Sequence, residues 1–173
     1  MATEIAIRRN PYLEYSEAVA RRRLDGEPLT FAKGDWPVGK GDATLAASTQ
    51  LVAIMPTLTI GWIKWRGGKP VDGRMGLVVD GFKPPRRADL DDHESANWEE
   101  DAAGDLRDPW QSSNEIVFTT PDATRIFTFR TSSRGGFGAL GELCKAHARA
   151  PAKSYPLVTL ETRTSITTVR SER

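Results

Sequence analysis

Stretches in which apolar and polar residues alternate indicate that this chain is built mainly of strands. Residues 28–32 form a short run between Gly- and Asp-rich turns and predict one strand. Residues 50–66 are the richest in β-branched and aromatic side chains. Because Pro56 and Gly61 interrupt this run, we expect either two strands or one strand bent at a bulge. After a turn, a further strand is expected near 76–82.

A β-hairpin is predicted in the second half of the chain. Residues 114–120 and 125–131 are both strand-like, and the turn sequence Pro-Asp-Ala-Thr joins them. In the second of these strands, Phe127 and Phe129 share one face. A last strand is expected over 155–162.

One helix is predicted between this hairpin and the last strand. The apolar residues that share one face of this helix are Phe137, Leu140, Leu143, Cys144 and His147. Ser132 or Ser133 caps its start, and Pro151 marks its end. We therefore expect a mainly β fold of the α+β type: a small curved sheet or an OB-like, partly open barrel, with one α-helix in the C-terminal half.

Composition limits the classes of protein that fit. The chain has 173 residues, enough for one domain of ordinary size, and no apolar run approaches the 18 or so residues of a membrane span. The single Cys144 excludes an intramolecular disulfide and a multi-cysteine zinc site. We expect a basic N-terminal arm over 1–23, and one domain over 24–173 that carries an acidic loop at 88–108.

The acidic loop makes the net charge of +1 misleading. It holds nine acids and one base, so the other 152 residues carry a net charge of +9. Such a loop can simply keep a protein soluble, or it can compete with a phosphate backbone for a basic surface. The acids to which we assign this regulatory role are Asp89, Asp91, Asp92, Glu94, Glu99, Glu100 and Asp101.

Aromatic and basic residues alternate on two of the predicted strands, as they do on sheets that bind single-stranded nucleic acid. The residues that we predict to contact nucleic acid are Trp62, Lys64, Trp65, Arg66, Phe127, Phe129, Arg130 and Arg134. In a small β domain, the same rings can instead belong to the core. The alternation also places Trp62 and Trp65 on opposite faces, so if Trp62 is inside, Trp65 is the more exposed.

The turn before the helix is a candidate anion site. Ser132, Ser133, Gly135 and Gly136 lie where free backbone N–H groups and the helix dipole favour a phosphate. The turn lacks the Walker A pattern, and an ordinary serine-capped helix start explains the same residues.

Other catalytic or metal chemistry has weaker support. The acidic loop lacks the spacing of an EF-hand, and Cys144 lies three residues before His147 without a third group to orient a dyad. We expect no metal, no cofactor and no enzymatic activity. A metal-dependent nuclease stays open only if carboxylates converge in space.

Several segments, in order, resemble a family of uncharacterised phage and prophage proteins associated with replication and recombination functions. These segments are GWIKWRGGKPV, GFKPPRRADL, DPWQSSN and FTFRTSSRGGFGALGELCKAHAR, together with Trp98 in the acidic stretch. The resemblance covers roughly residues 12–160. Members often continue past the last strand to a further apolar strand, whereas this sequence ends SITTVRSER, which leaves barrel closure open.

The residues and the resemblance together predict a phage accessory protein that binds single-stranded DNA without sequence specificity. The location this implies is the cytoplasm of a bacterial host cell, with no membrane contact and with homo-oligomerisation left open. The alternative is a protein-interaction module or host-defence inhibitor. In that case the acidic loop acts as a nucleic-acid mimic and binds basic replication or host-defence proteins.

Overall fold

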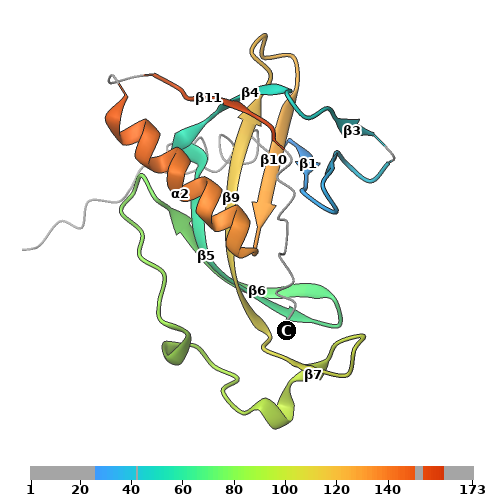
Figure 1. The fold of residues 1–173 in the computed structure, drawn as a ribbon. Coiled ribbons are helices and arrows are strands. Elements are labelled where there is room, and N and C mark those ends of the chain that lie inside the picture. Colours follow the sequence, from blue (N-terminus) through green and yellow to red (C-terminus); the bar gives the residue numbers. More distant parts are fainter. Residues whose placement is uncertain (1–25, 42, 151–153, 162–173) are drawn as a thin grey trace, which may run out of the picture.

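The computed structural model describes residues 26–41, 43–150 and 154–161, and it shows a curled, half-barrel sheet crossed by one long helix (Figure 1). The mainly β, OB-like fold that the sequence predicts is thereby confirmed. The predicted arm over 1–23 lies outside the described residues.

Seven strands form the main sheet. They are β1 (Glu27–Leu29), β4 (Gln50–Ala53), β5 (Thr59–Arg66), β6 (Lys69–Leu77), β9 (Trp110–Thr119), β10 (Ile126–Thr131) and β11 (Leu157–Thr159). The order is β1-β10-β9-β4-β11, and β5 also pairs with β9 while β6 pairs with β5. β9 is the centre of the sheet, because its first half pairs with β5 and its second half pairs with β4.

Smaller elements extend this sheet. Two short hairpins pair β2 (Trp36–Pro37) with β3 (Thr44–Leu45), and β7 (Glu99–Glu100) with β8 (Leu106–Arg107). Three single 3₁₀ turns are η1 (Met55–Thr57), η2 (Arg87–Asp89) and η3 (Ser95–Asn97). The turn η3 and the β7–β8 hairpin lie within the predicted acidic loop at 88–108, and η2 overlaps its start.

Two of the strand predictions hold in detail. Residues 50–66 are two strands, β4 and β5, which η1 separates at Pro56. Within β5, a Cβ atom on Gly61 would lie 2.0 Å from the carbonyl oxygen of Arg74, so only glycine fits there. The hairpin of β9 and β10 is also present, although β9 begins earlier than predicted, at Trp110.

The strand predicted near 76–82 is wrong in position. Gly67 and Gly68 have φ angles of 54° and 71°, and their tight turn sends the chain straight back along β5. β6 therefore begins at Lys69 and ends at Leu77. The predicted first and last strands are shorter than expected, since β1 ends at Leu29 and β11 spans only Leu157–Thr159.

The helix α2 (Arg134–Arg149) is confirmed together with its cap. The hydroxyl oxygen of Ser133 accepts a hydrogen bond from the backbone N–H of Gly136 at 3.0 Å. Within the part of the chain that the structure describes, no helix is long and apolar enough to span a membrane.

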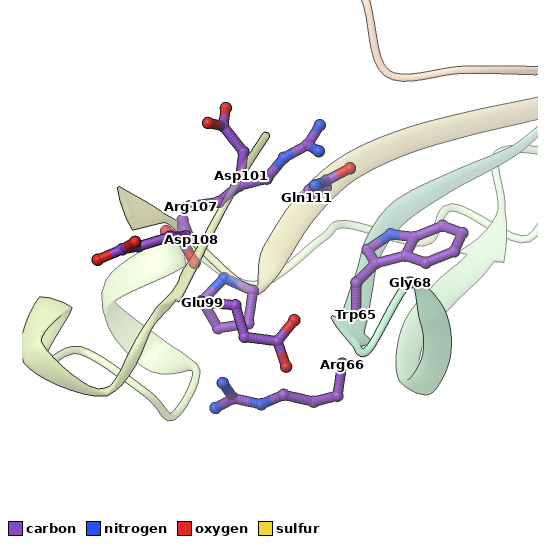
Figure 2. Close-up of a pocket in the computed structure, with 10 residues that line it drawn as sticks. Trp65, Arg66, Gly68, Glu99, Asp101, Arg107, Asp108 and Gln111 are labelled. Carbon is purple, nitrogen blue, oxygen red and sulfur yellow. The ribbon is translucent and has the colours of Figure 1, made fainter. Parts of the chain in front are cut away.

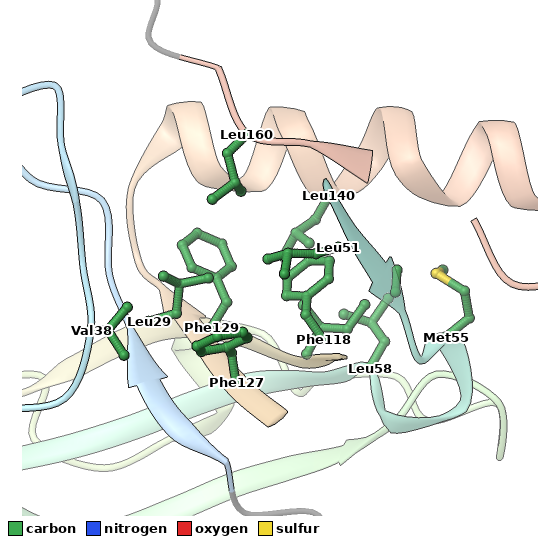
Figure 3. Packing of buried hydrophobic residues seen from close by; sticks show 12 residues of the cluster. Leu29, Val38, Leu51, Met55, Leu58, Phe118, Phe127, Phe129, Leu140 and Leu160 are labelled. Atoms are coloured by element: carbon green, nitrogen blue, oxygen red, sulfur yellow. The ribbon is translucent and has the colours of Figure 1, made fainter. Parts of the chain in front are cut away.

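The core lies between α2 and one face of the sheet (Figure 3). Its buried residues are Leu29, Val38, Leu51, Ala53, Met55, Leu58, Ile116, Phe118, Phe127, Phe129, Leu140 and Leu160. The largest of the described side chains that are almost completely buried are Phe127, Leu29, Leu51 and Ile116. Because strands alternate, the same face of the sheet continues along β5 and β9 beyond the helix, and the opposite face turns away from the core.

β6 forms one edge of the sheet, since among the described residues it pairs only with β5. Both backbone groups of Gly73, near its middle, are already bonded to neighbouring side chains. The N–H of Gly73 donates to Oδ1 of Asp72 at 2.7 Å, and its carbonyl oxygen accepts from Nη1 of Arg74 at 3.2 Å.

Candidate nucleic-acid interface

The structure places two of the four predicted stacking rings in the core. Phe127 has no exposed surface, and Phe129 is 8% exposed. Both rings lie on the face of β10 that packs beneath α2, so neither offers a side to a base (Figure 3). The prediction that Phe127 and Phe129 contact nucleic acid is therefore corrected: the apolar stripe of the helix needs this face of the strand as its packing partner.

Trp62 and Lys64 lie on the same face as the core, but beyond the end of the helix. This alternation follows from the register, in which Trp62 pairs with Ser112 and Lys64 pairs with Trp110. The indole N–H of Trp62 donates to the carbonyl oxygen of Pro85 at 2.8 Å. Trp62 is half-buried, and the chain leading into the acidic segment lies against it.

Two aspartates of the acidic segment, defined here as residues 88–108, bind the cations of β5. The ammonium of Lys64 is 2.8 Å from a carboxylate oxygen of Asp91 and 2.7 Å from one of Asp92. The guanidinium of Arg66 is 2.8 Å from the same carboxylate of Asp92. Two of the four predicted phosphate-binding cations are thus already paired with carboxylates of the acidic segment.

Further hydrogen bonds hold this pair of aspartates in place. The indole N–H of Trp110 donates to the carboxylate of Asp91 at 2.6 Å. The carbonyl oxygen of Asp92 accepts from Arg87 at 2.8 Å and from the indole N–H of Trp98 at 2.9 Å. Asp92 has a φ angle of 56°, a left-handed conformation that an aspartate adopts only at a cost.

Through that hydrogen bond Trp98 connects two parts of the acidic segment, because Asp92 belongs to the segment as well. Arg87 holds the other end of the segment, because its guanidinium forms two hydrogen bonds with the carboxylate of Asp108, at 2.7 and 2.9 Å. The segment is therefore a built structure on the sheet and not a loose loop.

These contacts keep the paired groups charged. The hydrogen bond from Lys64 is the largest cause that lowers the pKa of Asp91, with the indole of Trp110 next. The hydrogen bond from Lys64 also lowers the pKa of Asp92, and that from Arg66 adds to it. In return, the hydrogen bonds to Asp91 and then Asp92 raise the pKa of Lys64.

The remaining acids of the segment divide into bound and open groups. Asp89 pairs with Arg86 across a single turn, and the carboxylate of Glu99 accepts the N–H of Gly67 at 3.0 Å. Within the described ranges, Glu94 and Glu100 form no ion pair with a basic side chain, and both are exposed. Asp101 is exposed as well, and its carboxylate accepts backbone N–H groups of its own turn, which lower its pKa.

Trp65 lies on the opposite face of β5, between two hollows in the surface. The first hollow, of about 420 Å³, also contains Arg66, Arg107, Glu99, Asp101 and Asp108 (Figure 2). The second, of about 530 Å³, follows β9 toward β10 and β1. Trp65 and Gln111 line both hollows, so the half-buried indole forms the divide between them.

The second hollow brings together several of the predicted residues. Trp65, Arg130 and Ser132 all line it, together with Thr128 and Glu115. Arg130 forms an ion pair with Glu115, so its charge is balanced inside the hollow.

Two residues of the predicted anion-binding turn have structural roles. The hydroxyl of Ser133 is used as the helix cap, and a Cβ on Gly136 would lie 2.0 Å from the hydroxyl oxygen of Thr131, so this glycine serves close packing. Space is open beside Gly135. Arg134, the first helical residue, is exposed and forms no ion pair among the described residues.

Two residues of the hollows were missed in the sequence. Arg107 is the single base within the acidic segment, and a count of net charge conceals it. Gln111 falls outside the hairpin as predicted, which began only at residue 114. The alternation of β9 would have identified Gln111, had the strand been extended back to Trp110.

The described part of the structure adds no support for a catalytic cysteine or for a metal site. Cys144 packs partly buried against the core, and burial raises the pKa of its thiol, which disfavours a reactive thiolate. Among the described residues, no group of three or more His, Cys, Asp or Glu side chains is arranged to hold a metal ion.

Comparisons with protein-family models, with curated proteins and with solved structures gave no match for this chain. The resemblance to phage and prophage proteins therefore stays a prediction, and function has to be inferred from the site itself.

Proposed function

We propose that this chain is a phage or prophage accessory protein that binds single-stranded DNA without sequence specificity, and that Trp65 is its base-stacking residue. The observation that carries this proposal is the position of Trp65 between two hollows that both contain arginine, Arg66 and Arg107 on one side and Arg130 on the other. An indole with cations on both sides suits a strand whose bases stack while its phosphates follow the flanking charges.

Strand alternation supports the choice of Trp65 over the other predicted rings. Phe127 and Phe129 are inside the core, and Trp62 lies beneath the chain near Pro85. Trp65 lies on the face of the sheet opposite the core and Trp62, where it lines the two hollows. Single-strand binding surfaces need only a few rings, because each stacked base contributes about 1–3 kcal/mol.

The acidic segment acts in this proposal as a competitor within the same chain. Asp91 and Asp92 hold the cations of Lys64 and Arg66, which a phosphate backbone would otherwise neutralise. Glu99, Asp101 and Asp108 further lower the positive potential of the first hollow. We therefore expect modest affinity in the native protein, and a strong dependence on salt.

The test is fluorescence anisotropy of a labelled oligothymidine of about 20 nucleotides across a salt series. We expect the Trp65→Ala variant to bind about 5- to 100-fold more weakly, because one stacked base is lost. Tyr155→Ala is the matched control, since Tyr155 is an exposed aromatic residue that lines neither hollow. Absence of binding by the native protein at low salt, or an affinity indifferent to salt, would overturn the proposal.

A second function has support from the open acids. Glu94, Glu100 and Asp101 are exposed, and they leave an acidic face available to a basic protein partner. This is the nucleic-acid mimic of the alternative hypothesis. The two functions predict opposite results for one variant, in which Glu94 and Glu100 become Gln and Asp101 becomes Asn.

If single-stranded DNA is the ligand, this triple variant binds oligothymidine more tightly than the native protein, because repulsion is removed. If the acidic face is the binding surface, the same variant loses its affinity for a labelled Lys- and Arg-rich peptide, and the native protein binds no DNA. Both measurements use the same anisotropy assay.

A further inference from the structure

An exposed aromatic ring follows, in the chain, directly after a residue of the wall of the hollow opposite Trp65. Trp65 comes from β5 and Thr30 follows β1, and these two strands lie on opposite sides of the β9–β10 pair. Thr30 lines the hollow, and the next residue is Phe31, whose side chain is 46% exposed. Phe31 packs against Trp36 on the core side of this edge, whereas Thr30 faces the hollow, so a strand that leaves the hollow reaches this ring by passing around the edge of the sheet at β1.

The ring of Phe31 is backed by two other rings. Its centroid is 4.8 Å from that of Trp36, and Trp36 is in turn 5.8 Å from Phe129 in the core. Among the described residues, the buried indole N–H of Trp36 has no acceptor, so ring packing and not a hydrogen bond fixes Trp36 here. Phe31 is thus supported on one side and open on the other, which is the arrangement of a stacking platform.

A tight turn follows the ring and presents a cation. Ala32 and Asp35 exchange backbone hydrogen bonds of 3.1 and 3.0 Å, and they close a two-residue loop of Lys33 and Gly34. Both loop residues have positive φ angles, 53° and 92°, as a type I′ turn requires. Lys33 is exposed and forms no ion pair within the described part of the chain.

Lysine is a costly residue at that position. Glycine or asparagine adopts a positive φ more easily, and either would make the same turn at lower cost. Conformational cost of this kind concentrates at functional sites, and here it places an ammonium beside an exposed ring.

We propose that residues 30–35 form a second contact for the strand that Trp65 binds. Phe31 stacks on a base, and Lys33 contacts the neighbouring phosphate. This inference rests on the proposed function, and it adds a binding path that runs from Trp65 through the hollow beside Arg130 and Thr128 and then around the edge at β1 to the turn at Lys33.

The experiment compares two lengths of oligothymidine, about 4 and about 20 nucleotides, with three variants of the full chain. Phe31→Ala removes the ring, Phe31→Trp replaces it with a larger one, and Lys33→Gly removes the cation while it suits the positive φ. Because the glycine relieves strain, loss of folding does not explain its effect. Tyr155→Ala again serves as the control for an exposed aromatic residue outside the path.

We expect Phe31→Ala to weaken binding of the long oligonucleotide by about 5- to 100-fold, with little change for the short one, and Phe31→Trp to restore it. Lys33→Gly should lower the slope of log affinity against log salt by about 0.7, which corresponds to one phosphate contact on a single strand.

Two outcomes overturn the inference in distinguishable ways. If the native protein binds both oligonucleotides and these variants bind them equally well, Phe31 and Lys33 are not contacts, while the proposed function stands. If the native protein binds neither oligonucleotide, the proposed function and the second contact fall together.

Discussion

Trp62 and Trp65 are three residues apart on β5 and both are half-buried, yet different groups surround them. Trp62 belongs to what we call the covered region, where Lys64 and Trp110 lie beneath Asp91 and Asp92. Trp65 belongs to the open region, which it forms with the two hollows. The same mixture of aromatic rings and cations can therefore bind a segment of the chain or remain available to a ligand. The face of the strand on which each residue lies determines which of the two occurs.

The largest effect is expected when the covered region loses its central ring. Trp110 is 3% exposed, and it contacts Lys64 and Arg74 through cation–π interactions at 5.5 and 5.8 Å. Trp110→Ala should lower the free energy of unfolding by about 3–5 kcal/mol, measured in urea. Trp65→Ala is the comparison, and an equal loss of stability in both variants would mean that the two regions do not differ as described.

The next largest effect tests whether the acidic segment competes with nucleic acid for the cations of β5. Asp92→Asn removes the charge that Lys64 and Arg66 share, and asparagine tolerates the positive φ of this residue. We expect the affinity for oligothymidine to rise about 2- to 5-fold as Arg66 is released from its carboxylate, while Lys64 keeps its ion pair with Asp91. Asp122→Asn, in the exposed turn between β9 and β10, is the control. An unchanged affinity in Asp92→Asn would show that Arg66 takes no part in binding.

Extremes of pH should release the acidic segment from the covered region. The pKa values of Asp91 and Asp92 lie below their ordinary value of 3.8, so their contribution to stability is present above that pH and is lost as pH falls through the lowered values. The pKa of Lys64 lies above 10.5, so its contribution is present below that pH and is lost as pH rises through the raised value.

Near-ultraviolet circular dichroism between pH 2 and 11.5 would follow this release through the tryptophan environments. The double variant with Asn at 91 and 92 is the control, because it lacks the titrating carboxylates. A native signal that stays flat below pH 4 would argue against ion pairing as the hold on the segment.

The smallest effect is expected for a cation of the open region. Arg107→Gln removes one cation beside Trp65 in the first hollow. We expect the slope of log affinity against log salt to fall by about 0.7, with little loss of stability because Arg107 is exposed. Arg149→Gln, at the far end of α2, is the matched control. A larger change of slope in the control would place the phosphate path elsewhere.

Local patterns predicted those parts of the fold that local rules govern. The helix follows from its apolar period and its serine cap. Alternation predicted the opposite faces of Trp62 and Trp65, and Trp65 does line a hollow with Gln111, although the pairing of β5 with β6 shifts between Lys64 and Trp65. β6 was misplaced because Pro70, Gly73 and Gly76 interrupt its apolar pattern. β6 forms because the glycine turn brings it alongside β5. The strand propensities of its residues do not reveal that pairing.

The site was harder to predict because it depends on distant contacts. Asp91 and Lys64 are 27 residues apart, and no spacing rule links an acidic run to one strand among several. The burial of Phe127 and Phe129 was, by contrast, present in the sequence. Two rings on one face of a strand, followed at once by an amphipathic helix, form the two halves of a core.

The edge strand β6 has a consequence for crowded solutions. Exposed edges allow strands of neighbouring molecules to add on, which is a common start of aggregation. At Gly73 the N–H is held by Asp72 and the carbonyl by Arg74, so an approaching strand finds neither group free in the middle of the edge. These two side chains act as gatekeepers that favour colloidal stability, and a mutation of Asp72 or Arg74 would first show itself as loss of solubility.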